Sequence, residues 1–188
     1  MKVYLSALLL SLSVLAFPAQ ADPIKPLSTL RLLELREEIR DASAKYTMLV
    51  DRIAGEPDGR QWADGAFTKD AVLRGFHPNG EKFLELNGRE AIYDRFGKRH
   101  PRADQSANTP ATTNRHFMVN IVFESVTEDE IKTITNAMSI STLKDDTGSS
   151  CDKCSGTPRT VSIFIYYDTW KKENNEWKKS ISDIHFRN

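Results

Sequence analysis

A single apolar stripe runs through residues 28–54. Its members recur at alternating spacings of three and four residues, which is the period of one face of an α-helix. The pattern predicts a helix over 28–54 that begins at Ser28 as N-cap and stops at Gly55. It covers fewer than four heptads, so we expect core packing rather than a coiled coil. The stripe consists of Leu32, Leu35, Ile39, Ala42, Tyr46, Leu49 and Ile53.

Shorter elements follow this helix. A second helix is expected at Arg60–Phe67, and strands at Ala71–Phe76 and Lys82–Leu86. Pro78-Asn79-Gly80 between these strands is typical of a hairpin turn. Asn87-Gly88 should then begin a third helix, before a polar stretch.

The C-terminal half has a different pattern, with four runs rich in Val, Ile, Thr, Phe and Tyr. Short turns separate successive runs, which predicts an antiparallel meander. Helices followed by strands indicate an α+β fold, in which helices cover one face of a curved sheet. The four expected strands are Arg115–Ser125, Glu130–Leu143, Arg159–Lys171 and Glu176–Phe186.

The strand Arg115–Ser125 carries apolar residues at both its odd-numbered and its even-numbered positions. Strict alternation would place Phe117 and Ile121 on one face, and Met118 and Val122 on the other. We therefore expect the sheet to be covered on both sides, by helices on one and by a second copy of the chain on the other. The predicted assembly is a homodimer.

The first residues have the pattern of a signal peptide. Lys2 precedes the uncharged run Leu5–Phe17, and Ala19-Gln20-Ala21 offers small residues at the cleavage positions. The apolar run has 13 residues, fewer than the roughly 20 that cross a bilayer. We expect cleavage after Ala21 and a single mature domain, 22–188, that is periplasmic or secreted and has no membrane contact.

The charge composition excludes some classes of binding partner. Lys and Arg number 26 and Asp and Glu also 26, which gives a formal net charge of zero. This balance excludes a polybasic nucleic-acid binder and an acidic disordered tail as descriptions of the whole protein. We expect no nucleic-acid partner.

Two cysteines, Cys151 and Cys154, are separated by two residues. In an oxidising compartment such a pair is most simply a disulfide. A thioredoxin-like site would need a helix beneath the first cysteine, whereas Gly, Ser and Pro flank the pair. A zinc site would need two more ligands at a matching spacing, which the four histidines do not offer. We expect a disulfide at a loop tip and no metal.

Several local motifs, in order, resemble the SnoaL-like branch of the nuclear transport factor 2-like superfamily. Together they span roughly residues 30–186. The resemblance implies a cone, in which a strongly bent antiparallel sheet wraps over N-terminal helices as in a cystatin-like α+β barrel, with a pocket inside and often a dimer across the outer face. The motifs are Tyr46-x4-Asp51, Trp62-x4-Phe67-Thr-Lys-Asp-Ala71, Asn87-Gly-Arg-Glu-Ala-Ile92, Thr113-Asn-Arg-His116-Phe-Met-Val-Asn120 and Tyr167-Asp-Thr-Trp170 through Trp177.

The family includes polyketide cyclases, scytalone dehydratase, ketosteroid isomerase and members without catalysis. In dehydratase-like members an Asp from the first helix pairs with a His on the third strand, and Asp51 and His116 occupy these positions. A carboxylate fixes the imidazole tautomer and raises its basicity, so the ring can take a proton next to a carbonyl. Where the dehydratase has a second His one strand later, an ungapped count gives Ser141 here.

Two functions remain open. One is an exported lyase or isomerase without cofactor, which uses Asp51 and His116 on a small apolar molecule. The other is a non-catalytic ligand-binding or protein-interaction domain of the same fold. No nucleotide, metal or flavin motif is present in the sequence. The candidate substrate-binding residues are Tyr46, Trp62, Phe76, Asn120 and Tyr167.

Overall fold

A computed structural model describes residues 26–53, 58–98, 112–143 and 160–187. The N-terminal part of these residues holds four helical segments, with a pair of strands between the second and the third. The long helix α1 begins after Ser28, whose hydroxyl accepts a hydrogen bond from the backbone N–H of Arg31 at 3.2 Å, as an N-cap does. The segments are α1 (Thr29–Arg52), α2 (Asp58–Ala66), α3 (Arg89–Ile92) and a π-helical turn, η1 (Tyr93–Gly97).

Six strands form one sheet in the order β2-β1-β6-β5-β4-β3. The last four strands form the predicted meander, and the β1–β2 hairpin is also present. One pairing was not foreseen: β1 runs parallel to β6, which joins the hairpin to the meander. The strands are β1 (Phe67–Phe76), β2 (Lys82–Asn87), β3 (Thr112–Val126), β4 (Glu130–Leu143), β5 (Thr160–Glu173) and β6 (Glu176–Phe186).

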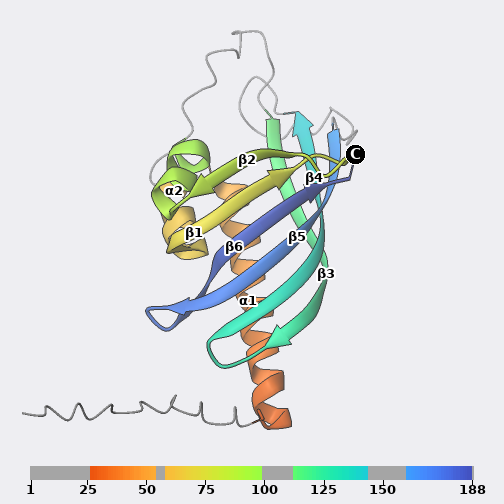
Figure 1. Cartoon of the computed structure of the whole chain (residues 1–188). Helices are drawn as coiled ribbons and strands as arrows, with labels where there is room; N and C mark the ends of the chain where they lie inside the picture. The colour runs from red at the N-terminus through yellow and green to blue at the C-terminus, as the bar shows by residue number, and fades with distance from the viewer. Residues whose placement is uncertain (1–25, 54–57, 99–111, 144–159, 188) are drawn as a thin grey trace, which may run out of the picture.

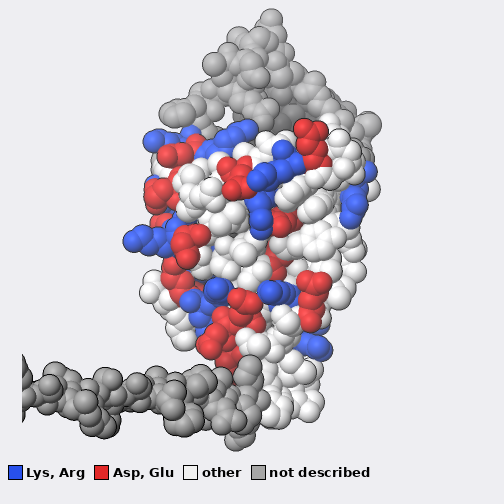
Figure 2. Space-filling model, in the orientation of Figure 1, with Lys and Arg blue, Asp and Glu red and all other residues white. Residues whose placement is uncertain are grey.

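The sheet is strongly bent and unclosed, and it curves around α1, while α2 and α3 lie at the β1–β2 end (Figure 1). The predicted α+β cone is therefore confirmed. On the face of the molecule shown in Figure 2, acidic and basic side chains are interspersed. None of the described helices is long and apolar enough to span a bilayer.

The interior has two apolar clusters. Near the start of α1, Leu35 and Ile39 pack tightly against Ile131, Trp170 and Trp177. The second cluster, near the end of α1, surrounds Tyr46, Trp62 and Phe67 and contains most of the buried aromatic rings. The helix stripe predicted from spacing thus enters both clusters through Leu35, Ile39 and Tyr46.

Strand β3 corrects one sequence-based prediction. Its pairing with β4 shifts register between Met118 and Asn120, and again between Phe123 and Ser125. Each shift adds a residue to β3, so the side chains exchange faces and strict alternation fails. Ile121 and Phe123 pair with the inward residues Thr135 and Thr133, and are not on the face of Phe117.

The outer face of the sheet nevertheless stays apolar. Large hydrophobic side chains on β3 and β5 are about half exposed or more. Phe117 and Ile163 both pair with Met138 of β4, so they lie in one row across this face. Exposed apolar side chains arranged in this way are typical of an interface. The exposed residues, called the outer apolar face below, are Phe117, Val122 and Ile163.

Candidate active site

A cavity of about 450 Å³ lies between the inner face of the sheet and the ends of α1 and η1. It is large enough for a small molecule, and most of its wall is apolar or aromatic. Two serines, Ser139 and Ser162, and two arginines, Arg52 and Arg95, add polar groups to the lining. The aromatic rings of the wall are Tyr46, Trp62, Phe83, Phe96, Phe164, Tyr166 and Phe186.

Asp51 and His116 meet in the cavity wall. Oδ1 of Asp51 lies 2.7 Å from Nδ1 of His116 and also accepts the backbone N–H of His116 at 2.9 Å. The two side chains are only 12% and 18% exposed. The double contact fixes both the carboxylate and the ring, and ties the last turn of α1 to β3.

This contact also selects the tautomer of the neutral ring. An ionised carboxylate only accepts hydrogen bonds, so in a neutral His116 the proton sits on Nδ1. Nε2 then keeps its lone pair and is the ring nitrogen left for a ligand. A histidine held in this way is arranged as a general base.

Two buried tyrosines share the wall with this pair. Tyr46 of α1 and Tyr166 of β5 are 5% and 3% exposed, and their rings meet edge to face with centroids 6.1 Å apart. Burial raises the pKa of Tyr166 well above its usual value, and negative charge nearby together with a hydrogen bond to Tyr46 adds to the shift. Each phenol hydroxyl can donate a hydrogen bond to an oxygen of a bound molecule.

A second ion pair, between a carboxylate and an ammonium group, lies beneath these rings. Nζ of Lys179 is 2.9 Å from Oδ2 of Asp168, and Ser182 donates to Oδ1 of Asp168 at 2.6 Å. The ammonium also lies 3.8 Å from the ring centroid of Tyr46 and 4.3 Å from that of Tyr166. Lys179 is 1% exposed and does not line the cavity, so it does not contact a molecule bound there.

The structure gathers some of the predicted site residues and separates others. Tyr46 and Trp62 line the cavity with Asp51 and His116. The other three candidates, Phe76, Asn120 and Tyr167, do not line it.

Phe76 and Tyr167 pack on either side of His185, with ring centroids 4.3 and 5.0 Å away. Phe76 follows Gly75, and Tyr167 follows Tyr166, both of which line the cavity, so the two rings project from the opposite face of the sheet. Asn120 follows the β3 bulge and accepts a hydrogen bond from Asn136 at 2.8 Å.

Ser141 pairs with Asn114, whereas Ser139 lies opposite His116 and lines the cavity. Cys151, Cys154 and residues 1–21 lie outside the described residues. Within the described residues, no group of three His, Cys, Asp or Glu side chains could hold a metal ion.

Sequence reasoning missed Tyr166, Ser139, Ser162, Arg52 and Arg95. Tyr166 could have been predicted from the alternation along β5, because every second residue of this strand faces inward. These inward residues are Phe164, Tyr166, Asp168 and Trp170. No sequence pattern marks the two arginines, since an exposed arginine at the end of a helix is common.

Comparisons with known proteins agree with the fold. A family model described as a SnoaL-like domain matches residues 31–181. No curated protein matches the sequence.

Similar solved structures include a putative scytalone dehydratase from Novosphingobium aromaticivorans, with 19% identity, 82% and 85% of the two chains covered and a TM-score of 0.55. A hexachlorocyclohexane dehydrochlorinase (LinA) is 17% identical, with 86% and 90% covered and a TM-score of 0.57. The beta subunit of a benzoate 1,2-dioxygenase from Burkholderia mallei is 16% identical, with 87% and 93% covered and a TM-score of 0.58. At these identities the likenesses show the shared fold alone. The family match over residues 31–181 shows that this chain belongs to the SnoaL-like family.

Proposed function

We propose that this protein is a cofactor-independent lyase or isomerase that acts on a small, mainly apolar molecule carrying a carbonyl group. One observation carries the proposal: the Asp51–His116 contact of 2.7 Å lies in the wall of a mostly apolar cavity. Two of the similar structures are a putative scytalone dehydratase and a dehydrochlorinase, whose names denote eliminations.

The geometry supports the following sequence. Nε2 of His116 takes a proton from the carbon next to the carbonyl, and the C–H electron pair moves into an enolate. The hydroxyl of Tyr46 donates to the enolate oxygen, and Asp51 stabilises the imidazolium that has formed. In an elimination the electrons then form a C=C bond while a C–O bond breaks, and the imidazolium proton leaves with the hydroxyl as water. In an isomerisation the substrate also carries a C=C bond next to the acidic carbon, so a dienolate forms and the same proton returns to its far carbon.

Proton abstraction can be tested without knowledge of the natural leaving group. We would incubate the protein with 1-tetralone, a bicyclic ketone, in D₂O and follow deuterium at the carbon next to the carbonyl by mass spectrometry. The wild type should exchange faster than buffer. His116→Gln should lower the protein-dependent rate by about 10²–10⁴, the usual value of a general base.

The alternative function predicts a different result. If the cavity only holds a ligand, tetralone will bind with equal affinity to wild type and His116→Gln, and neither will exceed the buffer rate. Ser141→Ala serves as the matched control, because Ser141 does not line the cavity. Its exchange rate should equal that of the wild type.

We further propose that the outer apolar face is covered by a second copy of the chain. The exposed Phe117, Val122 and Ile163 support this, and isologous pairing is the commonest way to bury such a face. Ile163→Glu should turn a dimer in sedimentation velocity into a monomer, whereas Lys132→Glu should not. A wild type that sediments as a monomer at tens of micromolar would refute the homodimer and favour a different partner.

Export is proposed from the N-terminal pattern, which lies outside the described residues. N-terminal sequencing of the protein from the producing cells should give Asp22 as the first residue. Material that still begins at Met1 would refute cleavage.

A further inference from the structure

The charges around the cavity are unevenly distributed. Arg52 at the end of α1 and Arg95 in η1 both line it, whereas Asp51 is its one carboxylate among the described residues. Asp51 already accepts two hydrogen bonds from His116. The cavity therefore offers two guanidinium groups and a single carboxylate that is already engaged.

These two arginines differ from most others on the described part of the chain. Arg31, Arg60, Arg74 and Arg89 each contact a carboxylate within 3.3 Å. Within the same described residues, neither Arg52 nor Arg95 has an ion pair. Arg95 instead lies over the ring of Phe96, 5.1 Å from its centroid, and Phe96 itself lines the cavity.

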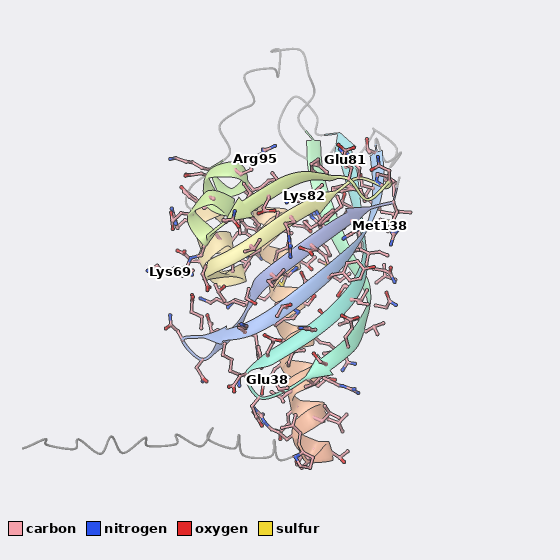
Figure 3. All side chains as sticks on the ribbon, viewed as in Figure 1. Glu38, Lys69, Glu81, Lys82, Arg95 and Met138 are labelled. Carbon is pink, nitrogen blue, oxygen red and sulfur yellow. The ribbon has the colours of Figure 1, made fainter. Side chains whose placement is uncertain are left out.

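The backbones that carry both side chains are fixed. Arg52 follows Asp51, which the contacts with His116 hold in place. Arg95 belongs to η1, which approaches α2 so closely that a Cβ on Gly59 would lie 1.9 Å from the carbonyl oxygen of Gly97. Figure 3 shows Arg95 and Glu38 toward opposite ends of the molecule. The C-terminal end of α1 lies at the same end of the molecule as Arg95. Both positive charges thus belong to anchored segments beside one cavity.

From these observations we propose that the natural ligand is an anion, an aromatic or polycyclic carboxylic acid whose carboxylate binds Arg52 and Arg95 while its rings fill the cavity. Guanidinium groups bind carboxylates in a planar, two-point manner, and the aromatic wall suits the ring system. Asp51 would repel the ligand's carboxylate, which favours a position of that group beside the arginines. The proposal rests on the proposed function only in using the same cavity, and it names the class of substrate.

Two dyes of one skeleton test it. 8-Anilinonaphthalene-1-sulfonate carries an anionic group, and N-phenyl-1-naphthylamine is the same molecule without it. Fluorescence titration should show that Arg52→Gln and Arg95→Gln each weaken binding of the sulfonate about 5-fold, and the double variant about 20-fold. Affinity for the neutral dye should change less than 2-fold. Arg40→Gln is the matched control, since it removes the same charge from α1 at an exposed position outside the cavity lining.

The outcomes separate this proposal from the proposed function. If both dyes bind and the two arginine variants leave the sulfonate affinity unchanged, the anion site is refuted while the cavity and its chemistry stand. Equal weakening by Arg40→Gln would also refute it, because the effect would then come from net charge. If the dyes behave as expected but His116→Gln exchanges tetralone like the wild type, the anion site stands and the catalytic role fails. If neither dye binds, the ligand class proposed here is refuted.

Discussion

Among the ion pairs of the described residues, those of Asp51 and Asp168 are both shielded from solvent, but their surroundings differ. Asp51 and His116 lie 2.7 Å apart in the wall of a cavity, and both side chains keep some exposure. Asp168 and Lys179 lie 2.9 Å apart, at most 3% exposed, beneath the rings of Tyr46, Tyr166 and Trp170. Only the first pair can exchange a proton with a bound molecule. Access, more than the identity of the paired groups, separates a candidate catalytic pair from a structural one.

Replacement of the buried Lys179 should have the largest effect on stability. Lys179→Met leaves Asp168 charged and buried without its partner, which should lower the free energy of unfolding by about 3–5 kcal/mol. Urea unfolding followed by circular dichroism measures this. Lys132→Met, an exposed lysine whose nearest carboxylate is 3.7 Å away, is the control and should cost less than about 0.5 kcal/mol.

A double replacement sharpens the same comparison. Lys179→Met combined with Asp168→Leu removes both charges and should recover most of the lost stability, because an apolar pair has no desolvation cost. A double variant as unstable as Lys179→Met alone would mean that the pair contributes net stability, contrary to this interpretation.

The pair in the cavity wall should affect chemistry more than folding. Asp51→Asn keeps the shape but removes the charge that holds and stabilises the ring of His116, so tetralone exchange should fall about 10- to 100-fold. Affinity for the neutral dye should stay within 2-fold of the wild type. An exchange rate equal to that of the wild type would show that the carboxylate does not assist the histidine.

The smallest predicted effect concerns alkaline pH. The pKa of Tyr166 is raised in the folded protein, so above pH 10 the unfolded chain loses a proton that the folded chain keeps. Stability should therefore be fully present below pH 10 and fall as the pH rises further. Between pH 8 and 10.5 this loss is about 0.8 kcal/mol for one tyrosine. In Tyr166→Phe the fall should be smaller by that amount, and an unchanged fall would show that Tyr166 ionises freely.

Much of the fold followed from local patterns. The spacing of Leu35, Ile39 and Tyr46 predicted α1, and turn residues placed the strands of the meander. The parallel contact between β1 and β6 was not predictable in the same way, since it joins strands about a hundred residues apart and no local signal specifies it.

The candidate site was predicted only in part. Asp51 and His116 were found because their motifs resemble a family in which these positions are paired. Tyr167 was chosen where Tyr166 faces the cavity, since one residue decides which face of a strand a side chain occupies. The β3 bulge turns Asn120 to the face of the sheet away from the cavity, and the sequence of β3 contains no pattern that predicts this bulge.

The sequence by itself determined the periodicities, and with them the helix, the strands and the α+β class, because each depends on neighbours within a few residues. Only the tertiary structure decided which of two chemically similar pairs faces a cavity and which is sealed. It also decided that Arg52 and Arg95, more than forty residues apart, line the same cavity. These outcomes depend on strand register and on the approach of distant segments, and both are set by packing across the whole domain rather than by any local pattern.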